Sequence, residues 1–335
     1  MPAADSICIA AVMKQEQPYI VEWVAWHRLL GFDIMIADNG GNDGQSELLL
    51  NLANAGLISY IDARMFTRAP QVLAYYAMFR LARRTGVRYV GFLDADEFFE
   101  PLSVAVAPGA GATLVSRLFA QTNALALAFN WMTFGSSNLI DISPEPVTQR
   151  FIGSAPIKFD TNRHFKSFCD VTQVARTLGS GIFSHLMLNP HGLMTEASRY
   201  SHDGLPMLFD AQQFGLTQQV SWINARIRHY VVKSRAEYDR KASRGSASLS
   251  RQDYGSSFFN RHDRNDILTP LGDEALAMLV DAMRDLDIKA VSAHARRSRR
   301  NLIDTATMWW HARPAIRMLL ARLLKEARHC FNRAN

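Results

Sequence analysis

The chain has 335 residues, of which 48% are hydrophobic, enough to bury a sizeable core in one main domain with an addition. The formal net charge is +6, the isoelectric point is about 9.3, and basic residues crowd positions 226–251 and 296–328, which suits anionic partners such as nucleotide phosphates, acidic lipids or nucleic acid. Three widely separated cysteines exclude a disulfide framework and a Cys-x-x-Cys zinc site, and they favour a reducing compartment.

Short apolar segments alternate with helical patterns through the first hundred residues. The predicted strands cover 7–13, 32–37, 57–61 and 89–93, and the predicted helices between them cover 19–30, 45–54 and 69–85. Gly31, Gly56 and Gly86 end the three helices. Strands that alternate with helices predict βαβ units and an α/β fold with a mainly parallel sheet.

The pattern changes after Pro101. A helix is predicted over 113–121 and a strand over 124–131, and residues 135–225 mix short strands with turns rich in Gly, Ser, Asn and Pro. A further strand over 223–232 leads into a basic stretch that includes a short helix over 237–244. From about 246 the chain is polar and loop-like, up to a helix over 272–286.

The last segment, 305–331, has the periodicity of an amphipathic helix. Trp309, Ile316 and Leu323 fall on its apolar stripe, while Arg313 and Lys325 lie off it. Such a helix can lie on an anionic membrane surface, or it can pack on the domain or on a second subunit. Amphipathicity alone does not separate these interpretations.

Three carboxylates follow directly on the apolar run 89–93. Asp94 and Asp96 are separated by one residue, so on an extended backbone they project from the same face and can share one hard cation. Glu97 follows them. The alternative is a surface turn with solvated acids, but a buried strand that leads into the acids favours a metal-assisted phosphate site.

Polar residues also follow the first two predicted strands. In a parallel sheet the carboxyl ends of the strands meet at one crevice, which brings Lys14, Glu16, Asp38 and Asn39 to the acids at 94–96. Carboxylates at the first two strand ends suit hydrogen bonds from a nucleoside base and ribose. A divalent cation at the acids would bridge a diphosphate. There is no GxGxxG or Walker loop, so phosphate binding must rely on the metal and on basic side chains.

The basic side chains come from the stretch 228–244. Lys233, Ser234, Lys241 and Arg244 are the candidates for the phosphates. His229 is a candidate to complete the coordination of the cation held by the acids, although a lone histidine in a strand is often structural.

These motifs, taken together and in register, resemble the family-2-like glycosyltransferases, in particular the group related to family 92, over about residues 7–245. The matching residues are Lys14, Glu16, Pro18, Tyr19, Ile20, Glu22, Trp23, His27, Gly31 and Phe32; Asp38 and Asn39; Leu93, Asp94, Asp96, Glu97 and Phe98; Asn130, Trp131, Phe134, Gly135, Ser136 and Ser137; and His229, Tyr230, Lys233, Ser234, Lys241, Arg244 and Gly245. Two motifs depart from the usual pattern: Lys-Gln-Glu stands where Lys-Asn-Glu is commoner, and Asp38-Asn39 is followed by two glycines.

The resemblance implies a Rossmann-like GT-A fold, a nucleotide-sugar donor, and Mn²⁺ or Mg²⁺. It implies that Asp38 contacts the nucleoside, that Asp94 and Asp96 form the DxD motif with Asp96 as the direct ligand, and that His229 meets the metal or the diphosphate. It places Trp131, Phe134, Gly135, Ser136 and Ser137 on the acceptor side. The domain would cover 1–245, with a nucleotide-binding half (1–100) and an acceptor half (101–245), followed by a helical extension (246–335).

An inverting mechanism, which we expect, needs a carboxylate base near the acceptor hydroxyl. The candidates are Asp170 and Asp203, with Asp141, Glu145 and Glu196 also in the acceptor half, and the sequence does not choose among them.

The favoured hypothesis is a metal-dependent glycosyltransferase of polysaccharide biosynthesis that acts on a glycan or lipid-linked acceptor. The chain start lacks the features of a secretory signal, and no segment approaches about 18 uninterrupted apolar residues. We therefore expect a cytoplasmic protein, peripheral at the inner membrane face if the C-terminal helix binds anionic lipid. No nucleic-acid partner is expected, because aromatic and basic residues are not interleaved outside the basic patches.

Two other hypotheses remain open. The first is a basic membrane- or nucleic-acid-binding protein without catalysis. The second is an aspartate-nucleophile phosphatase, which also uses an Asp-x-Asp pair after a strand but would form an aspartyl-phosphate.

Overall fold

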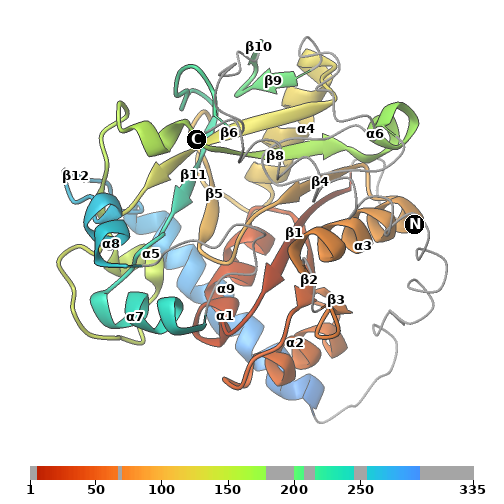
Figure 1. Ribbon diagram of the computed structural model, residues 1–335. Coiled ribbons are helices and arrows are strands. Elements are labelled where there is room, and N and C mark those ends of the chain that lie inside the picture. Colours follow the sequence, from red (N-terminus) through yellow and green to blue (C-terminus); the bar gives the residue numbers. More distant parts are fainter. Residues whose placement is uncertain (1–5, 67–69, 179–199, 207–215, 245–254, 295–335) are drawn as a thin grey trace, which may run out of the picture.

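The computed structural model describes residues 6–66, 70–178, 200–206, 216–244 and 255–294 (Figure 1). In these residues a ten-stranded sheet forms the centre. The strands are β1 (Ile7–Met13), β2 (Asp33–Asp38), β3 (Ser59–Asp62), β4 (Tyr89–Phe92), β5 (Glu97–Pro101), β6 (Ala126–Thr133), β8 (Phe165–Asp170), β9 (Tyr200–His202), β10 (Leu205–Pro206) and β11 (Ala225–His229), and β7 (Gly153–Ser154) pairs separately with β12 (Ile267–Leu268).

Parallel strands form one end of the sheet, in the order β3-β2-β1-β4 with β3 at the edge. β8 then runs antiparallel to β4 and to β6, while β9 and β11 both run parallel to β6. β5 branches off this path and pairs antiparallel with β11. The predicted α/β fold with a mainly parallel sheet is therefore confirmed.

Helices cover both faces of the sheet (Figure 1). They are α1 (Gln17–Leu29), α2 (Gln45–Asn54), α3 (Pro70–Thr85), α4 (Ala110–Thr122), α5 (Val147–Arg150), α6 (Val171–Leu178), α7 (Arg235–Arg244), α8 (Ser256–His262) and α9 (Asp273–His294), with a 3₁₀ turn at Asp160–Arg163. One core cluster joins side chains of α1, α2, α4 and α9 to one face, and a second joins α3 and α6 to the other. Burial of both faces explains why the central strands read as near-continuous apolar runs.

Gly31 shows how local sequence sets the end of α1. Its φ of +88° is in the left-handed region that favours glycine, its N–H donates to the Arg28 carbonyl, and the Phe32 N–H donates to the His27 carbonyl. This is the Schellman arrangement that ends many helices. It delivers the chain directly into β2, beside β1.

Most predicted elements agree with the structure, and β1 and α2 agree to the residue. One prediction needs correction, and one strand was not predicted. Residues 97–101, which had no predicted element, form strand β5, because β11 supplies a partner more than a hundred residues away in sequence. The stretch 246–271, predicted as loop, contains α8 and β12, and β12 pairs with β7.

Helix α9 begins close to its predicted start and continues past residue 286. Leu271, Ala275 and Leu279 join the same core cluster as Trp23 and the other buried side chains of α1. The division of the chain at residue 245 stays a prediction, and the amphipathic segment 305–331 lies outside the described residues. Within the described part of the chain, no helix combines the length and the apolar content needed to cross a membrane.

Candidate active site

The parallel pairing brings the predicted strand ends to one edge of the sheet. Lys14 and Glu16 follow β1, Asp38 ends β2 opposite Met13, and Asp94 comes shortly after β4. This edge is where open α/β sheets bind ligands. The candidate site is therefore built around the turn that joins β4 to β5.

Helix α1 fixes this acidic turn. The Trp23 indole N–H donates to the backbone carbonyls of Asp94 (3.1 Å) and Glu97 (2.9 Å). The Glu97 N–H donates to the Asp94 carbonyl, and the Tyr230 N–H donates to the Asp96 carbonyl. The backbone of the turn is thus held from three sides, which sets the direction in which its carboxylates point.

Asp94 is held by a buried lysine. Lys166, whose side chain is 1% exposed, places its Nζ 2.7 Å from Asp94 Oδ2 and 3.1 Å from Glu97 Oε2. Burial opposes the charge on Lys166, but the two carboxylates outweigh it and raise its pKa. The Asp94 side chain is 37% exposed, and its Oδ1 has a long contact of 3.5 Å from the Tyr75 hydroxyl. Asp94 is therefore the more accessible of the two aspartates.

Asp96 is buried and surrounded by positive groups. Its Oδ2 accepts a hydrogen bond of 2.6 Å from Lys241 Nζ, and its Oδ1 lies 3.7 Å from His229 Nε2. Burial opposes ionisation, but Lys241 and the nearby Lys233 outweigh it and hold the pKa of Asp96 well below its usual range. Asp96 is therefore a carboxylate at neutral pH.

His229 is buried beside Asp96, and its ring packs 4.2 Å from that of Trp131. Burial lowers the pKa of His229 to about 3, so the imidazole is neutral. A neutral imidazole is the form that ligates metals. Its Nδ1 is buried and has no hydrogen-bond partner among the described residues, which is unusual for a buried nitrogen.

Glu97 belongs to the site although its role could not be read from the sequence. Its Oε2 accepts the Asp94 N–H (2.9 Å), while its Oε1 is buried without a partner among the described residues. Burial raises the pKa of Glu97, and Lys166 opposes this rise. In the sequence, only the position of Glu97 directly after the two aspartates indicated a role for it. No sequence motif identified Lys166, its partner on β8.

Two carboxylates of this turn have the chemistry that a divalent cation needs. Within the described residues, no group of three or more His, Cys, Asp and Glu side chains is arranged to hold a metal ion. Mg²⁺, however, is usually held by one or two carboxylates together with substrate phosphates. Asp94 and Asp96 are such carboxylates: a lysine binds Oδ2 of each, and His229 Nε2 lies 3.7 Å from Asp96 Oδ1.

A basic pocket lies next to Asp96. Its lining comes from the segment after β1 and from the segment between β11 and the end of α7: Gln15, Glu16, Tyr19, Val232, Lys233, Glu237, Arg240, Lys241 and Arg244. The two acids in this lining are paired with arginines, Glu16 with Arg244 and Glu237 with Arg150. Positive charge therefore exceeds negative charge in the pocket, which suits an anionic ligand.

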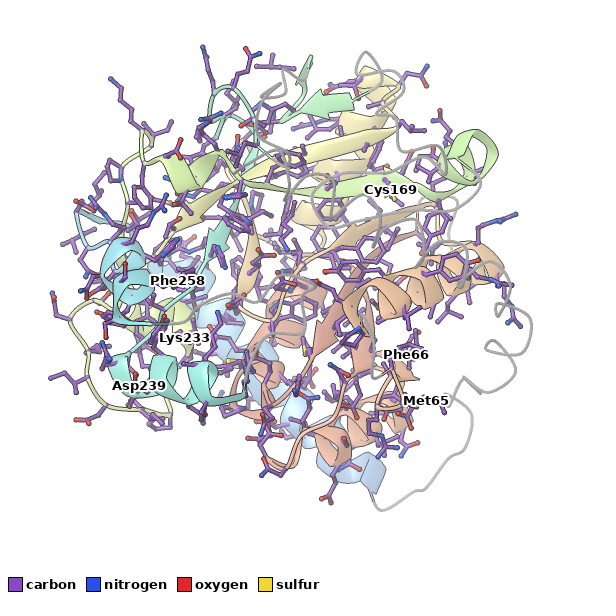
Figure 2. The ribbon with its side chains drawn as sticks, in the orientation of Figure 1. Met65, Phe66, Cys169, Lys233, Asp239 and Phe258 are labelled. Carbon is purple, nitrogen blue, oxygen red and sulfur yellow. The ribbon has the colours of Figure 1, made fainter. Side chains whose placement is uncertain are left out.

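The predicted phosphate-binding residues differ in their surroundings. Lys233 lies where β11 leads into α7 (Figure 2), has a φ of +59°, and places its Nζ 4.3 Å from the centre of the Tyr19 ring. Lys14 Nζ donates to the Arg244 carbonyl at 3.5 Å. Ser234 is fully buried, and its hydroxyl donates to Glu237 Oε2 at 2.6 Å. The Ser234 hydroxyl oxygen also accepts the Glu237 N–H at 3.3 Å, which makes it the cap of α7. Ser234 is thus a structural neighbour of the pocket, and it is absent from the pocket lining.

Asp38 reaches the predicted edge, but its carboxylate is enclosed. It is fully buried and accepts hydrogen bonds from Gln45 (2.7 Å), Tyr60 (3.0 Å) and the N–H of Gly40 (2.9 Å). Asp38 therefore fixes the loop after β2, and Asn39, half-buried beside it, is the more accessible side chain of the pair.

The predicted acceptor residues are split by the structure. Trp131 is half-buried and stays beside His229. Phe134 is fully buried, with its ring 4.7 Å from that of Tyr230, so it is a core residue and presents no open face.

Gly135, Ser136 and Ser137 join the segment 263–265. The N–H groups of Ser136 and Ser137 donate to Asp263 (2.6 Å) and Asn265 (2.8 Å), and a Cβ on Gly135 would meet the Arg264 backbone at 2.5 Å. This stretch therefore joins the end of β6 to the segment 263–265, and its backbone serves a structural role.

In both favoured candidates for the catalytic base, Asp170 and Asp203, other groups of the protein already bind the carboxylate. Asp170 lies opposite Tyr89, at the far end of β4 from Asp94, and pairs with Arg88 at 3.0 Å. Asp203 accepts hydrogen bonds from the Ser221 hydroxyl and from the N–H groups of residues 223–225, and burial raises its pKa. Asp141 and Glu145 are exposed, and Glu196 lies outside the described residues.

The comparisons with known proteins bear on this geometry. No protein-family model matches the chain. A rice protein (Oryza sativa subsp. japonica), named as a glycosyltransferase family 92 protein, is 28% identical over 98 residues, which is 28% of this chain and 16% of the rice protein. Over these residues the chain is similar in sequence to a protein named as a family 92 glycosyltransferase.

Among solved structures, that of TarS from S. aureus aligns with 85% of this chain and 49% of its own length, at 12% identity and a TM-score of 0.36. The chain thus spans about half of TarS and a small part of the rice protein. The mainly parallel sheet with helices on both faces agrees with the Rossmann-like GT-A fold that the resemblance implies.

Proposed function

We propose that the chain is a glycosyltransferase that takes a sugar from a nucleotide-sugar donor and holds the donor diphosphate between the 94–97 turn and the basic pocket. The observation that carries the proposal is the ionised, buried Asp96 beside neutral His229, at the carboxyl edge of a parallel sheet and next to a pocket with excess positive charge. The relationship to family 92 glycosyltransferases supports it.

In this proposal Asp94, Asp96 and His229 hold Mn²⁺ or Mg²⁺. When bound, the cation would neutralise charge that develops on the departing diphosphate. Lys233 and Lys241 line the same pocket and would contribute positive charge to the phosphates. Arg244 also lines the pocket and is held by its ion pair with Glu16. Asn39 is the candidate for contacts to the nucleoside.

We propose an inverting reaction on a glycan or lipid-linked acceptor that approaches over Trp131. An inverting enzyme needs a base within hydrogen-bond reach of the acceptor hydroxyl, and the described carboxylates leave this base unassigned. A cytoplasmic location, at the inner membrane face if the segment after residue 294 binds anionic lipid, completes the proposal.

A ligand screen tests the proposal. The melting temperature would be measured with UDP-, GDP-, CDP- and dTDP-sugars, each with and without Mn²⁺. A ligand at a hundred times its dissociation constant adds about 2.7 kcal/mol to the free energy of unfolding, so a donor should raise the melting temperature by a few degrees and more so with Mn²⁺.

Two variants localise the effect. Asp96→Asn should remove the Mn²⁺-dependent part of the shift and abolish hydrolysis or transfer of the donor sugar. Asp62→Asn, at the end of β3 on the same sheet edge and paired with Arg64, is the matched control and should keep both. A donor that stabilises Asp96→Asn as well as the wild type, with Mn²⁺ present, would refute the proposed site.

A further inference from the structure

We propose that Lys241 is an exchangeable counter-ion: its ammonium neutralises Asp96 in the empty site and transfers to the donor diphosphate when a divalent cation takes over Asp96. The inference rests on the proposed function and adds to it an order of events, in which cation and diphosphate bind together.

Lys241 lies where it can contact both Asp96 and an anion in the basic pocket. Its Nζ lies 2.6 Å from Asp96 Oδ2 and 2.9 Å from the Val231 carbonyl, and its side chain also lines the basic pocket. The Lys241 side chain is 15% exposed, whereas Lys166, which holds Asp94, is 1% exposed. Lys241 therefore stands at the mouth of the site and Lys166 in its interior.

The helix that carries Lys241 is fixed at both ends. At its start, the Ser234 hydroxyl and the Glu237 carboxylate cap each other in the Ser-x-x-Glu arrangement. At its end, Arg244 forms an ion pair with Glu16 and donates to the Lys14 and Gln15 carbonyls. Because α7 stays in place, the exchange requires only rotation of the four-carbon chain of Lys241.

Electrostatics favours the exchange. An ammonium at Asp96 Oδ2 and a divalent cation at Oδ1 of the same carboxylate repel each other, so a cation binds Asp96 more tightly when Lys241 moves away. A diphosphate in the adjoining pocket gives the ammonium a new anionic partner. Lys233 also interacts electrostatically with Asp96 and is buried; burial lowers the pKa of Lys233, and Asp96 opposes this change.

The test measures Mn²⁺ binding by electron paramagnetic resonance, in which free Mn²⁺ gives the signal that is lost on binding. Wild type and Lys241→Met are compared with Mn²⁺ alone and with Mn²⁺ plus UDP, GDP, CDP or dTDP. Lys289→Met removes an exposed lysine that pairs with Asp285 on α9 and serves as the control for the loss of one charge. Circular dichroism checks that each variant is folded.

Removal of the competing ammonium should tighten the binding of Mn²⁺ alone by roughly tenfold, and it should weaken the binding of the diphosphate that the wild type prefers by a similar factor. Lys289→Met should change neither. Unchanged affinity for Mn²⁺ alone in Lys241→Met overturns the exchange while leaving the proposed function in place, as does tighter Mn²⁺ binding without loss of diphosphate affinity. If no diphosphate promotes Mn²⁺ binding to the wild type, the metal site of the proposed function fails as well.

Discussion

Trp23 offers a sharp test of how the acidic turn is positioned. Its indole N–H is the donor that ties α1 to the carbonyls of Asp94 and Glu97. Trp23→Phe keeps an aromatic ring in the core but removes this donor. The matched control is Trp26→Phe, three residues further along α1, because the Trp26 indole donates to the Phe99 carbonyl (2.7 Å) within β5, away from the carboxylates.

The two variants should be similar in stability. Both indoles are fully buried, and a buried carbonyl that loses its donor costs about 1–3 kcal/mol. The smaller ring adds a cavity cost in both cases. We expect the free energy of unfolding to fall by roughly 2–5 kcal/mol for Trp23→Phe and by roughly 2–4 kcal/mol for Trp26→Phe.

The two variants should differ in their affinity for the nucleotide. With its backbone no longer held, the turn in Trp23→Phe samples other directions for Asp94 and Asp96, so affinity for the donor diphosphate should fall about fivefold to tenfold, or about 1–1.4 kcal/mol. Trp26→Phe should bind within about twofold of the wild type. Urea unfolding followed by circular dichroism gives the stabilities, and titration calorimetry with Mn²⁺ present gives the affinities. Equal affinities in the two variants would show that Trp23 does not position the site.

Three further predictions follow from other contacts. Lys166→Met should cost about 3–5 kcal/mol because it leaves buried Glu97 unpaired; urea unfolding of the double variant with Glu97→Gln should show a cost smaller than the sum of the singles, and additivity would contradict a direct pair. Burial lowers the pKa of His27 to about 3, so below pH about 6.5 the unfolded chain takes up a proton that the folded chain does not. The free energy of unfolding should therefore fall by up to about 1.4 kcal/mol for each unit by which the pH decreases. His27→Gln should flatten this slope in urea titrations between pH 7 and 4, and an unchanged slope would argue against a neutral buried imidazole. Ser234→Ala should lower the melting temperature through loss of the α7 cap, worth about 1 kcal/mol, while nucleotide affinity in calorimetry stays nearly constant; a large loss of affinity would instead make Ser234 a direct ligand contact.

For residues 7–93 the sequence sufficed to predict the order of strands and helices and the sheet edge to which the polar residues after the strands come. Residues 7–93 alternate between patterns that depend on neighbours only a few positions away, so periodicity and glycine breaks locate their elements. Parallel pairing then follows from connectivity alone. That is why Glu16, Asp38 and Asp94 could be assigned to one edge before the structure showed it.

Contacts between distant segments could not be predicted in the same way. Strand β5 exists because β11 pairs with it, and Lys166 reaches Asp94 only because β8 is inserted antiparallel beside β4. Nor does residue type show whether a carboxylate is already satisfied. Asp38 is of a residue type and at a strand end that suit ligand binding, yet its carboxylate already accepts hydrogen bonds from Gln45 and other donors of the protein.

Several residues that carry the family resemblance hold the scaffold together. Trp23 and His27 bind the backbone of the acidic turn and of β5, with His27 Nε2 accepting the Phe99 N–H at 3.2 Å. Glu22 is buried and accepts the N–H groups of Val147 and Thr148 at the start of α5. These side chains hold the scaffold and do not line the pocket.

In the proposed function, a scaffold of this kind fixes where a diphosphate and a cation would bind, because it sets the direction of the carboxylates at 94–97 and the position of α7. It places no constraint on the base or the sugar attached to the phosphates. Those must be recognised by side chains with accessible surface beyond the acids, such as Asn39 and Trp131. Substitutions at Asn39 and Trp131 should therefore change which donor or acceptor is used, whereas substitutions at Trp23 should weaken binding of all donors alike.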